Sequence, residues 1–338
     1  MALKGILLTL KESRIWYKFL EYIFVPIYKL FWEYIINFYG KLLYFFWFFK
    51  KRDSFDFKDD FTLKILKDYR SKEIATEIFS YLGQNNSEII KNYENKIKNL
   101  NMQNKINKHG DFKISLNDSL SEDIKKKLLD FALSEKNLST VSKYLKVFPV
   151  LRSISVDLNI VVDSKVERGS MLWHKDDFGF KSLDLFVTLC NLDDTNGPLF
   201  YVKKKNPIGV FFKLKNIIQN PTPGERNKVT IDDFKKYFSE DQIDSLRGES
   251  GTSLFIDPYN TYHRGGYCKS KSRLMLRIVY QTPDSVRIKH SDEIFLNTIS
   301  LGEKYNNSYF NYTLFKNKNI FKINEGLLSI YRMLHYKK

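Results

Sequence analysis

The sequence is poor in cysteine, with only Cys190 and Cys268 among its 338 residues. The two lie far apart and neither belongs to a C-x-x-C pair, which excludes a disulfide framework. Cys190 falls in an apolar run and is expected to be a small core residue. This cysteine usage predicts a reducing compartment, and we expect a cytoplasmic location.

Long uninterrupted apolar runs are also missing. No stretch reaches the roughly 20 apolar residues that a membrane-spanning helix needs. Met1–Glu12 contains one short apolar run, Gly5–Leu10, and no small-residue cleavage site. A cleaved secretory signal is therefore not expected.

Several catalytic and nucleic-acid motifs are absent as well. The chain has no G-x-x-x-x-G-K phosphate loop and no G-x-S-x-G nucleophile elbow. It has no zinc finger, aromatic RNA-binding motif or basic-region helix. The formal net charge is +16, but the lysines are scattered along the chain. This distribution favours solvated charge, and no nucleic-acid partner is expected.

The amino-terminal residues 1–52 are rich in aromatic side chains. Within Ile15–Phe49 the apolar residues are interrupted by charges at roughly whole-turn intervals, at Lys18, Glu21, Lys29, Glu33 and Lys41. This pattern predicts an amphipathic helical segment, kinked near Pro26. Three roles remain open: interfacial contact with an anionic membrane through the aromatic residues and Lys50–Arg52, packing or oligomerisation, and membrane spanning.

Residues 53–140 are predicted to be mainly helical. Phe61–Leu82 has helical apolar spacing and is followed by a turn signal at Gly83. Ser119–Leu138 is expected to form another helix, with Ser121 or Asp118 as its N-cap. Asn86–Lys108 fits a surface helix followed by a loop.

Short strands are expected after residue 140. Ile154–Val162 shows period-two alternation. Turn signals separate the further strand candidates, which are Met171–His174, Leu183–Leu189, Leu199–Val202, Ser253–Ile256 and Leu274–Tyr280. Such spacing indicates a sandwich or jelly roll within residues 141–285. Residues 203–249, with a helix-like Ile231–Leu246, are predicted to be an insertion, and 286–338 a C-terminal extension. The chain as a whole is thus predicted to be α+β.

The residues with the clearest chemistry are His174, Asp176 and His263. On a strand, positions i and i+2 face the same side, so His174 and Asp176 should project together. His263 follows a turn, a strand candidate and a short polar connection. Two imidazoles and one carboxylate are the ligands of a 2-His-1-carboxylate iron site, which leaves one face of the metal open.

A candidate anion anchor follows the second histidine. Arg273 comes ten residues after His263 in a strand candidate, and a guanidinium can bind a carboxylate through two parallel hydrogen bonds. Arg277 shares the same strand face and is a rival for this role. A surface ion pair is the alternative for either arginine, but the position of Arg273 after His263 favours the anchor.

Together these segments resemble the phytanoyl-CoA dioxygenase family. The resemblance covers roughly residues 150–282 and rests on the following segments: Trp173-His174-Lys175-Asp176-Asp177, Thr195-Asn196-Gly197-Pro198-Leu199, Gly251–Asp257, His263-Arg264-Gly265-Gly266, and Ser272-Arg273 with Tyr280. It implies a double-stranded β-helix of the cupin-like, jelly-roll type, with Fe(II) held by His174, Asp176 and His263. It also implies that 2-oxoglutarate chelates the iron and places its far carboxylate on Arg273.

One departure from the family limits what the resemblance implies. Where the family carries Pro-Gly-Ser-His, this chain has Val202–Pro207, so the family's substrates are not carried over. The retained Asp176 argues against the halogenating branch, in which a small residue leaves room for halide. The expected function is hydroxylation of a small-molecule or lipid-linked substrate, at the inner face of a membrane if the amino terminus binds lipid. The alternative is an inactive membrane-associated scaffold that retains the fold.

Overall fold

The computed structural model describes residues 34, 37–47, 65–67, 69–84, 112–161, 167–176, 182–203, 207–218, 227–283 and 303. The predicted segment Asn86–Lys108, nearly all of the C-terminal extension at 286–338, and most of the amino-terminal segment lie outside these residues.

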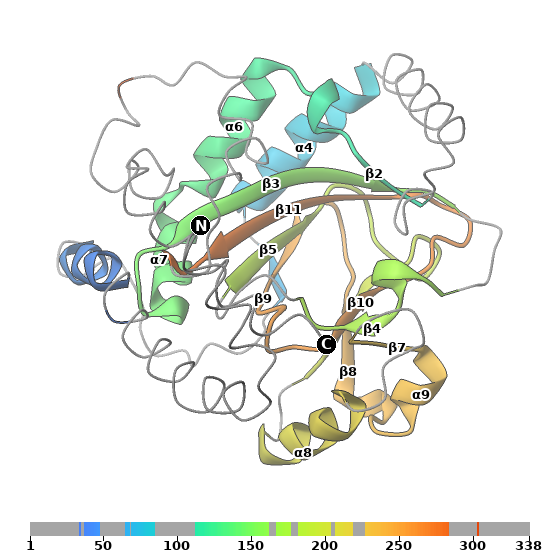
Figure 1. Cartoon of the computed structure of the whole chain (residues 1–338). Helices are drawn as coiled ribbons and strands as arrows, with labels where there is room; N and C mark the ends of the chain where they lie inside the picture. The colour runs from blue at the N-terminus through green and yellow to red at the C-terminus, as the bar shows by residue number, and fades with distance from the viewer. Residues whose placement is uncertain are drawn as a thin grey trace, which may run out of the picture.

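Two antiparallel sheets form the centre of the described structure (Figure 1). The first has the strand order β1-β9-β5-β11-β3-β2, formed by Ile65–Lys67, Thr252–Ile256, Ser182–Thr188, Arg273–Gln281, Val150–Asn159 and Lys113–Ser115. The second has the order β7-β4-β10-β6-β8, formed by Lys228–Val229, Trp173–His174, His263–Gly265, Leu199–Val202 and Ile243–Leu246.

The chain alternates between the two sheets. The strands β3, β5, β9 and β11 belong to the first sheet. The chain crosses to the second sheet for β4 after β3, for β6 after β5, and for β10 between β9 and β11. This alternation is consistent with a jelly roll. The α+β class is confirmed, and the strand predicted at Leu199–Val202 has the observed bounds of β6.

The outer face of the first sheet is covered by the helices α4 (Tyr69–Gln84), α6 (Glu122–Ala132) and α7 (Glu135–Leu145) (Figure 1). On β5, Leu183, Leu185 and Val187 join the core beneath these helices. Successive side chains of a strand point to opposite faces, so Asp184 and Phe186 point toward the second sheet. This alternation places the buried carboxylate of Asp184 on the inner face of a strand whose other central residues are apolar.

Two helix predictions require correction. The helix expected over Ser119–Leu138 is divided into α6 and α7. Ser121 caps α6 by accepting the N–H of Ile124, as predicted, but the helix ends at Ala132. The side chain of Asn137 donates to the carbonyl of Phe131, which stabilises the turn between the two helices. The helix expected over Phe61–Leu82 begins only at Tyr69, because Ile65–Lys67 pair with β9 as an edge strand.

The segment 203–249 contains more strand than its sequence suggested. It holds α8 (Pro207–Ile218), α9 (Ile231–Lys235) and the strands β7 and β8, which form the two edges of the second sheet. Ile231–Leu246 is α-helical only over its first five residues; the 3-10 helix Glu240–Gln242 and the strand β8 follow. Phe234 of α9 stacks on Trp173 of β4 at 4.1 Å between ring centroids, which holds this segment against the sheet.

Residues 37–47 form a helix that packs by one face. Leu43 lies in the core, the indole N–H of Trp47 donates to Ser139, and the carbonyl of Gly40 accepts the N–H of Phe148. The other face is exposed and apolar, and its residues are Phe38, Tyr39, Leu42, Phe45 and Phe46. Among the described residues, no helix is both long and apolar enough to cross a membrane.

Candidate metal centre

Sheet pairing positions the two histidines of the predicted triad. His263 of β10 is the cross-strand partner of His174 of β4. The prediction that His174 and Asp176 project from one face of the same strand was wrong, because β4 ends at His174. Asp176 lies beyond the strand, where its backbone N–H donates to the carbonyl of Pro258 at 2.9 Å.

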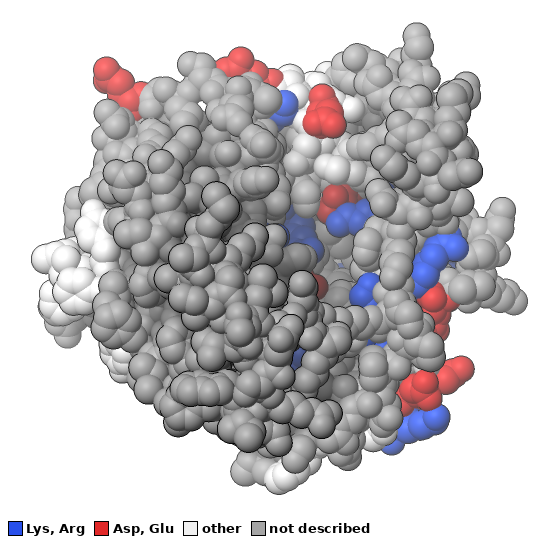
Figure 2. Space-filling model, viewed as in Figure 1, with Lys and Arg blue, Asp and Glu red and all other residues white. Residues whose placement is uncertain are grey.

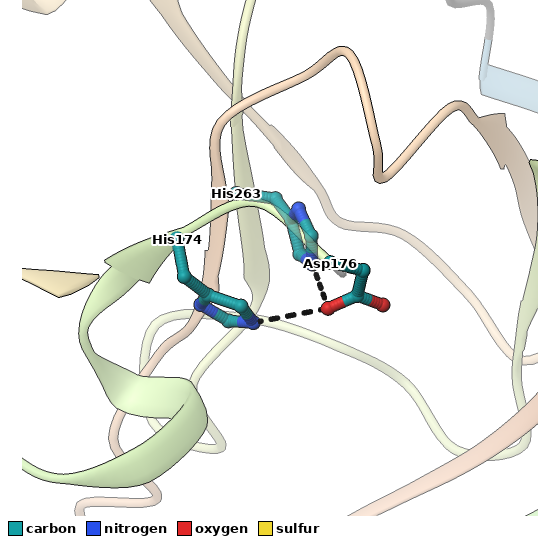
Figure 3. Close-up of side chains that lie close together, drawn as sticks. All are labelled: His174, Asp176 and His263. Atoms are coloured by element: carbon teal, nitrogen blue, oxygen red, sulfur yellow. Dashed lines mark ion pairs between the residues drawn. The ribbon is translucent and has the colours of Figure 1, made fainter. Parts of the chain in front are cut away.

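The three side chains converge nonetheless (Figure 3). The Oδ1 atom of Asp176 lies 3.5 Å from Nε2 of His174 and 3.7 Å from Nε2 of His263. Two donors that each lie about 2.1 Å from one ion are at most about 4.2 Å apart, and both distances satisfy this limit. All three ligand atoms lie within 4.8 Å of one another, so the two imidazole nitrogens need to approach each other by at most about 0.6 Å for all three atoms to bind one ion. The residues present therefore fit a divalent metal ion.

The tautomer of each histidine also suits a metal. Nδ1 of His174 lies 2.7 Å from the carbonyl oxygen of Leu172, and Nδ1 of His263 lies 3.1 Å from that of Thr261. A carbonyl can only accept, so each Nδ1 carries the proton and each Nε2 keeps its lone pair for a metal. Burial, aided by the neighbouring His174, lowers the pKa of His263 to about 4, so this ring is neutral near pH 7.

The turn between β9 and β10 braces two of the three ligands. Its first residue, Asp257, is buried and accepts hydrogen bonds from the backbone and side-chain N–H groups of Asn260 and from the hydroxyl of Tyr144 on α7. The same turn supplies the carbonyl of Pro258 to Asp176 and the carbonyl of Thr261 to His263. The helical layer therefore contacts, through one buried carboxylate, the turn that holds two of the ligands.

Arg277 of β11 is bound by two carboxylates. Its Nη2 lies 2.6 Å from Oδ2 of Asp176, and its Nε donates to Oδ2 of Asp184 at 2.7 Å. Burial alone would raise the pKa of Asp176, but Arg277 and the two imidazoles outweigh it and hold that pKa well below its usual range. Burial raises the pKa of Asp184 to about 6, against the opposing effect of Arg277.

Arg273 is in a different electrostatic situation. Its side chain is buried, and burial lowers the pKa of its guanidinium. Nη1 donates weakly to the carbonyl of Gly266 at 3.5 Å. Among the residues that the structure describes, no carboxylate lies within ion-pair distance of it. Of the two rival arginines, Arg277 is occupied by carboxylates and Arg273 is not.

One pocket connects the two histidines of the triad with Arg273. It is lined by residues of both sheets, including His174, His263, Phe186, Met275 and Arg273. Figure 2 shows basic and acidic side chains inside a hollow near the centre of the face in view. A molecule in this pocket can therefore contact both imidazoles and the buried guanidinium of Arg273.

Sequence reasoning missed Asp184. Its signal was a single acidic residue inside the apolar strand candidate Leu183–Leu189. A carboxylate at a position that alternation buries must find a cation, because an unpaired buried charge is very costly. The sequence indicated Arg277 only as an alternative to Arg273 for binding the co-substrate carboxylate. No pattern in the sequence around Arg277 or Asp176 predicted the contact between them.

Similarity to known proteins is found among solved structures and not at the level of sequence. No protein-family model matches the sequence, and no curated protein matches it. Among solved structures, the chain overlaps the epimerase SnoN, crystallised with Fe3+, alpha ketoglutarate and nogalamycin RO, at 15% identity and a TM-score of 0.34, over 51% of this chain and 63% of SnoN. It thus spans less than two thirds of the length of SnoN.

Two further solved structures overlap a larger share of the chain. The non-heme monooxygenase ThoJ matches at 12% identity and a TM-score of 0.37, over 66% of this chain and 74% of ThoJ. EctD from S. alaskensis, in its apoform, matches at 13% identity and a TM-score of 0.38, over 68% of this chain and 75% of EctD. Overlaps this weak assign neither a family nor an activity, so the phytanoyl-CoA dioxygenase resemblance stays a prediction.

Proposed function

We propose that this chain is an Fe(II)- and 2-oxoglutarate-dependent oxygenase, and that its two sheets form a double-stranded β-helix. The supporting observation is the convergence of His174, Asp176 and His263 next to a pocket that both imidazoles and the separate buried Arg273 line. His174, Asp176 and His263 would hold the iron by one face. Bound there, Fe(II) would supply the activation of dioxygen coupled to decarboxylation of 2-oxoglutarate to succinate.

The residues of the chain account for binding of the co-substrate. Three protein ligands leave three positions on the metal, enough for a chelating keto acid and one further ligand. The far carboxylate of 2-oxoglutarate would pair with Arg273, whose buried charge has no described carboxylate partner. Such a pair is charge-assisted and can be bidentate, which fixes the orientation of the keto acid in the pocket.

The remaining pocket wall supports a hydroxylase. Phe186 and Met275 give it an apolar surface near His174, where a substrate C–H group could be held while water is excluded. The substrate class is proposed to be a small molecule or a lipid-linked molecule. Retention of all three ligands weighs against the inactive-scaffold alternative, since a scaffold does not need two imidazoles that converge on a carboxylate.

The exposed face of helix 37–47 supports a peripheral membrane contact. Phe38, Leu42 and Phe45 recur at helical spacing on this face, and their exposed fractions are 65%, 40% and 53%. Aromatic side chains at such a surface suit the headgroup level of a bilayer. The basic net charge of the chain favours an anionic leaflet. The proposed location is cytoplasmic, at the inner face of a membrane.

Anaerobic titration of the Fe(II)-loaded protein with 2-oxoglutarate tests the function without knowledge of the substrate. Chelation of Fe(II) by a 2-oxo acid gives a visible charge-transfer band, which the wild-type protein should show at saturation. Arg273→Met should require at least about 30-fold more 2-oxoglutarate, since loss of one partner of a buried charge pair costs 2 kcal/mol or more. Arg247→Met, which removes a surface partner of Asp194, is the matched control.

Admitting oxygen to the same samples should release succinate from the wild-type protein above the rate without iron. A wild-type protein that binds iron but gives neither the band nor succinate would favour the scaffold alternative. Equal loss of iron and of 2-oxoglutarate in Arg273→Met would make that arginine structural.

A further inference from the structure

The two oxygens of Asp176 have separate partners. Oδ1 faces the Nε2 atoms of His174 and His263, at 3.5 and 3.7 Å. Oδ2 points away from them and is held by Nη2 of Arg277 at 2.6 Å. A carboxylate whose second oxygen is bound in this way can offer a metal one oxygen. If both oxygens turned to the metal, they would occupy a position that a chelating co-substrate needs.

Arg277 holds Asp176 in place but also weakens it as a ligand for a cation. A guanidinium in direct contact with Asp176 neutralises the charge that makes this carboxylate a good ligand for a cation. Asp184 offsets this effect. It is fully buried, and the same guanidinium is in contact with its Oδ2 through Nε and Nη2. With both carboxylates ionised, the cluster of Asp176, Arg277 and Asp184 has a formal charge of −1 instead of zero.

Register explains how these groups meet. Arg277 is the cross-strand partner of Phe186 on β5, and Asp184 lies two residues further along the same face. The guanidinium lies 5.4 Å from the centre of the Phe186 ring and reaches diagonally to Asp184. Its position is thus fixed by two neighbouring strands of the first sheet, while Asp176 belongs to the loop beyond β4. The pair links the two sheets at the metal centre.

We propose that Arg277 and Asp184 act as a pair of positioning residues: Arg277 restricts Asp176 to a single ligating oxygen, and Asp184 preserves the negative charge of that ligand. The pair rests on the proposed metal centre, and neither residue is one of its three proposed ligands. Partners of this kind beyond the ligands typically alter metal affinity by 10- to 100-fold when removed.

Calorimetric titration of the metal-free protein with Co²⁺ at about pH 7.5 tests the role of Asp184. Asp184→Asn keeps the shape and an acceptor oxygen for Arg277 but removes one charge. It should weaken Co²⁺ binding by roughly 10- to 100-fold. The double variant Asp184→Asn/Arg277→Met returns the cluster to a formal charge of −1. It should recover most of the lost Co²⁺ affinity, although it removes a second buried group.

A role limited to packing predicts the opposite order, with the double variant weaker than the single variant. That order, or wild-type affinity in Asp184→Asn, overturns the inference. Thermal unfolding of each metal-free variant shows whether it is folded, and Arg247→Lys, in a surface pair with Asp194, is the control for arginine replacement. A wild-type protein that does not bind Co²⁺ instead refutes the metal centre itself.

The variant Arg277→Lys tests the role of Arg277 separately from that of Asp184. A lysine keeps the positive charge but cannot reach both carboxylates with a planar fork, so Oδ2 of Asp176 is released. The Co²⁺ affinity should then stay within about threefold of wild type, while 2-oxoglutarate should bind the Co²⁺-loaded protein at least about tenfold more weakly. Unchanged 2-oxoglutarate binding would overturn the one-oxygen role.

Discussion

His263 on β10 lies directly opposite His174 on β4, and their ring centroids are 4.5 Å apart. Directly opposed residues of an antiparallel pair have Cβ atoms only about 5 Å apart, so strand pairing sets the separation of these imidazoles. The third ligand, Asp176, is held by the turn after β9 and by Arg277. The geometry of the site is therefore determined by elements that also form the core of the fold.

A divalent transition metal should stabilise the folded protein. At a free Co²⁺ concentration of about 100 times Kd, binding contributes about 2.7 kcal/mol, which raises the Tm by several degrees. His263→Gln should abolish this shift, because one of three ligands is lost. Differential scanning calorimetry measures it, and Mg²⁺, which prefers oxygen ligands, is the control. A similar shift in His263→Gln would mean that Co²⁺ binds elsewhere.

The approach of Gly265 to Arg273 gives a second prediction. A Cβ atom at Gly265 would lie 3.1 Å from Nη2 of Arg273, the far end of a flexible side chain. Gly265→Ala should displace the guanidinium without blocking folding, and so raise the Kd for 2-oxoglutarate by about tenfold, or about 1.4 kcal/mol. Co²⁺ affinity should not change. Titration calorimetry measures the affinities for 2-oxoglutarate and for Co²⁺ separately. If Gly265→Ala weakened Co²⁺ binding to the same extent, the effect would not be confined to Arg273.

Replacing Gly266 should have a different consequence from replacing Gly265. A Cβ atom at Gly266 would lie 2.8 Å from backbone atoms of Gly197 and Pro198, which cannot yield as a side chain can. Gly266→Ala should therefore lower the free energy of unfolding by more than 1 kcal/mol, in the range found for overpacked sites. Urea unfolding measures this change, and Gly265→Ala serves as the neighbouring control. Equal stability of the two variants would contradict the steric argument.

Local patterns were enough to predict most strands, and the reason is physical. Alternation in β3, and short apolar runs between turn signals in β5, β6, β9 and β11, are properties of each segment by itself, so these strands could be recognised without knowledge of their partners. The contact between Arg277 and Asp184 depends on cross-strand register, which no local pattern encodes. Likewise Ile65–Lys67 has helical spacing, and only the free edge of β9 makes it a strand. The ligand set could be named from its order along the chain, whereas the groups that orient it could not.

Acid should affect the metal-free protein through two opposing groups. The folded-state pKa of His263 is about 4, below its ordinary 6.5, so the unfolded chain binds the proton first and stability falls as pH drops from 6.5 to 4. The folded-state pKa of Asp184 is about 6, above its ordinary 3.8, so the folded chain binds the proton first and stability rises over the window from 6 to 4. Each contribution is roughly 2–3 kcal/mol.

Asp184→Asn removes the stabilisation that proton uptake by Asp184 gives the folded protein in acid. Relative to wild type, its free energy of unfolding should therefore fall by roughly 2–3 kcal/mol more between pH 6.5 and 4. Denaturant unfolding of both metal-free proteins at a series of pH values gives this difference directly. Parallel pH profiles would show that Asp184 does not take up a proton in this range.

The exposed helix 37–47 predicts binding to anionic vesicles. Phe38→Ser/Phe45→Ser should reduce sedimentation with phosphatidylserine vesicles by at least about tenfold, since each buried Phe side chain contributes roughly 1.5–3 kcal/mol. Phe79→Ser removes a Phe of α4 with a similar exposed fraction, 58%, and should have no effect. If the wild-type protein does not sediment with the vesicles, or Phe79→Ser is equally impaired, this helix does not bind membrane.

The contact between Tyr144 and Asp257 bears on how far the protein can be shortened. Tyr144 belongs to α7, and through Asp257 it supports the turn whose carbonyls hold Asp176 and His263. A fragment starting at residue 146 would keep every ligand and both arginines yet lose this support. The smallest fragment that preserves the metal centre must therefore include α7, and exchange of the helical layer between proteins of this architecture would alter ligand geometry without changing any ligand.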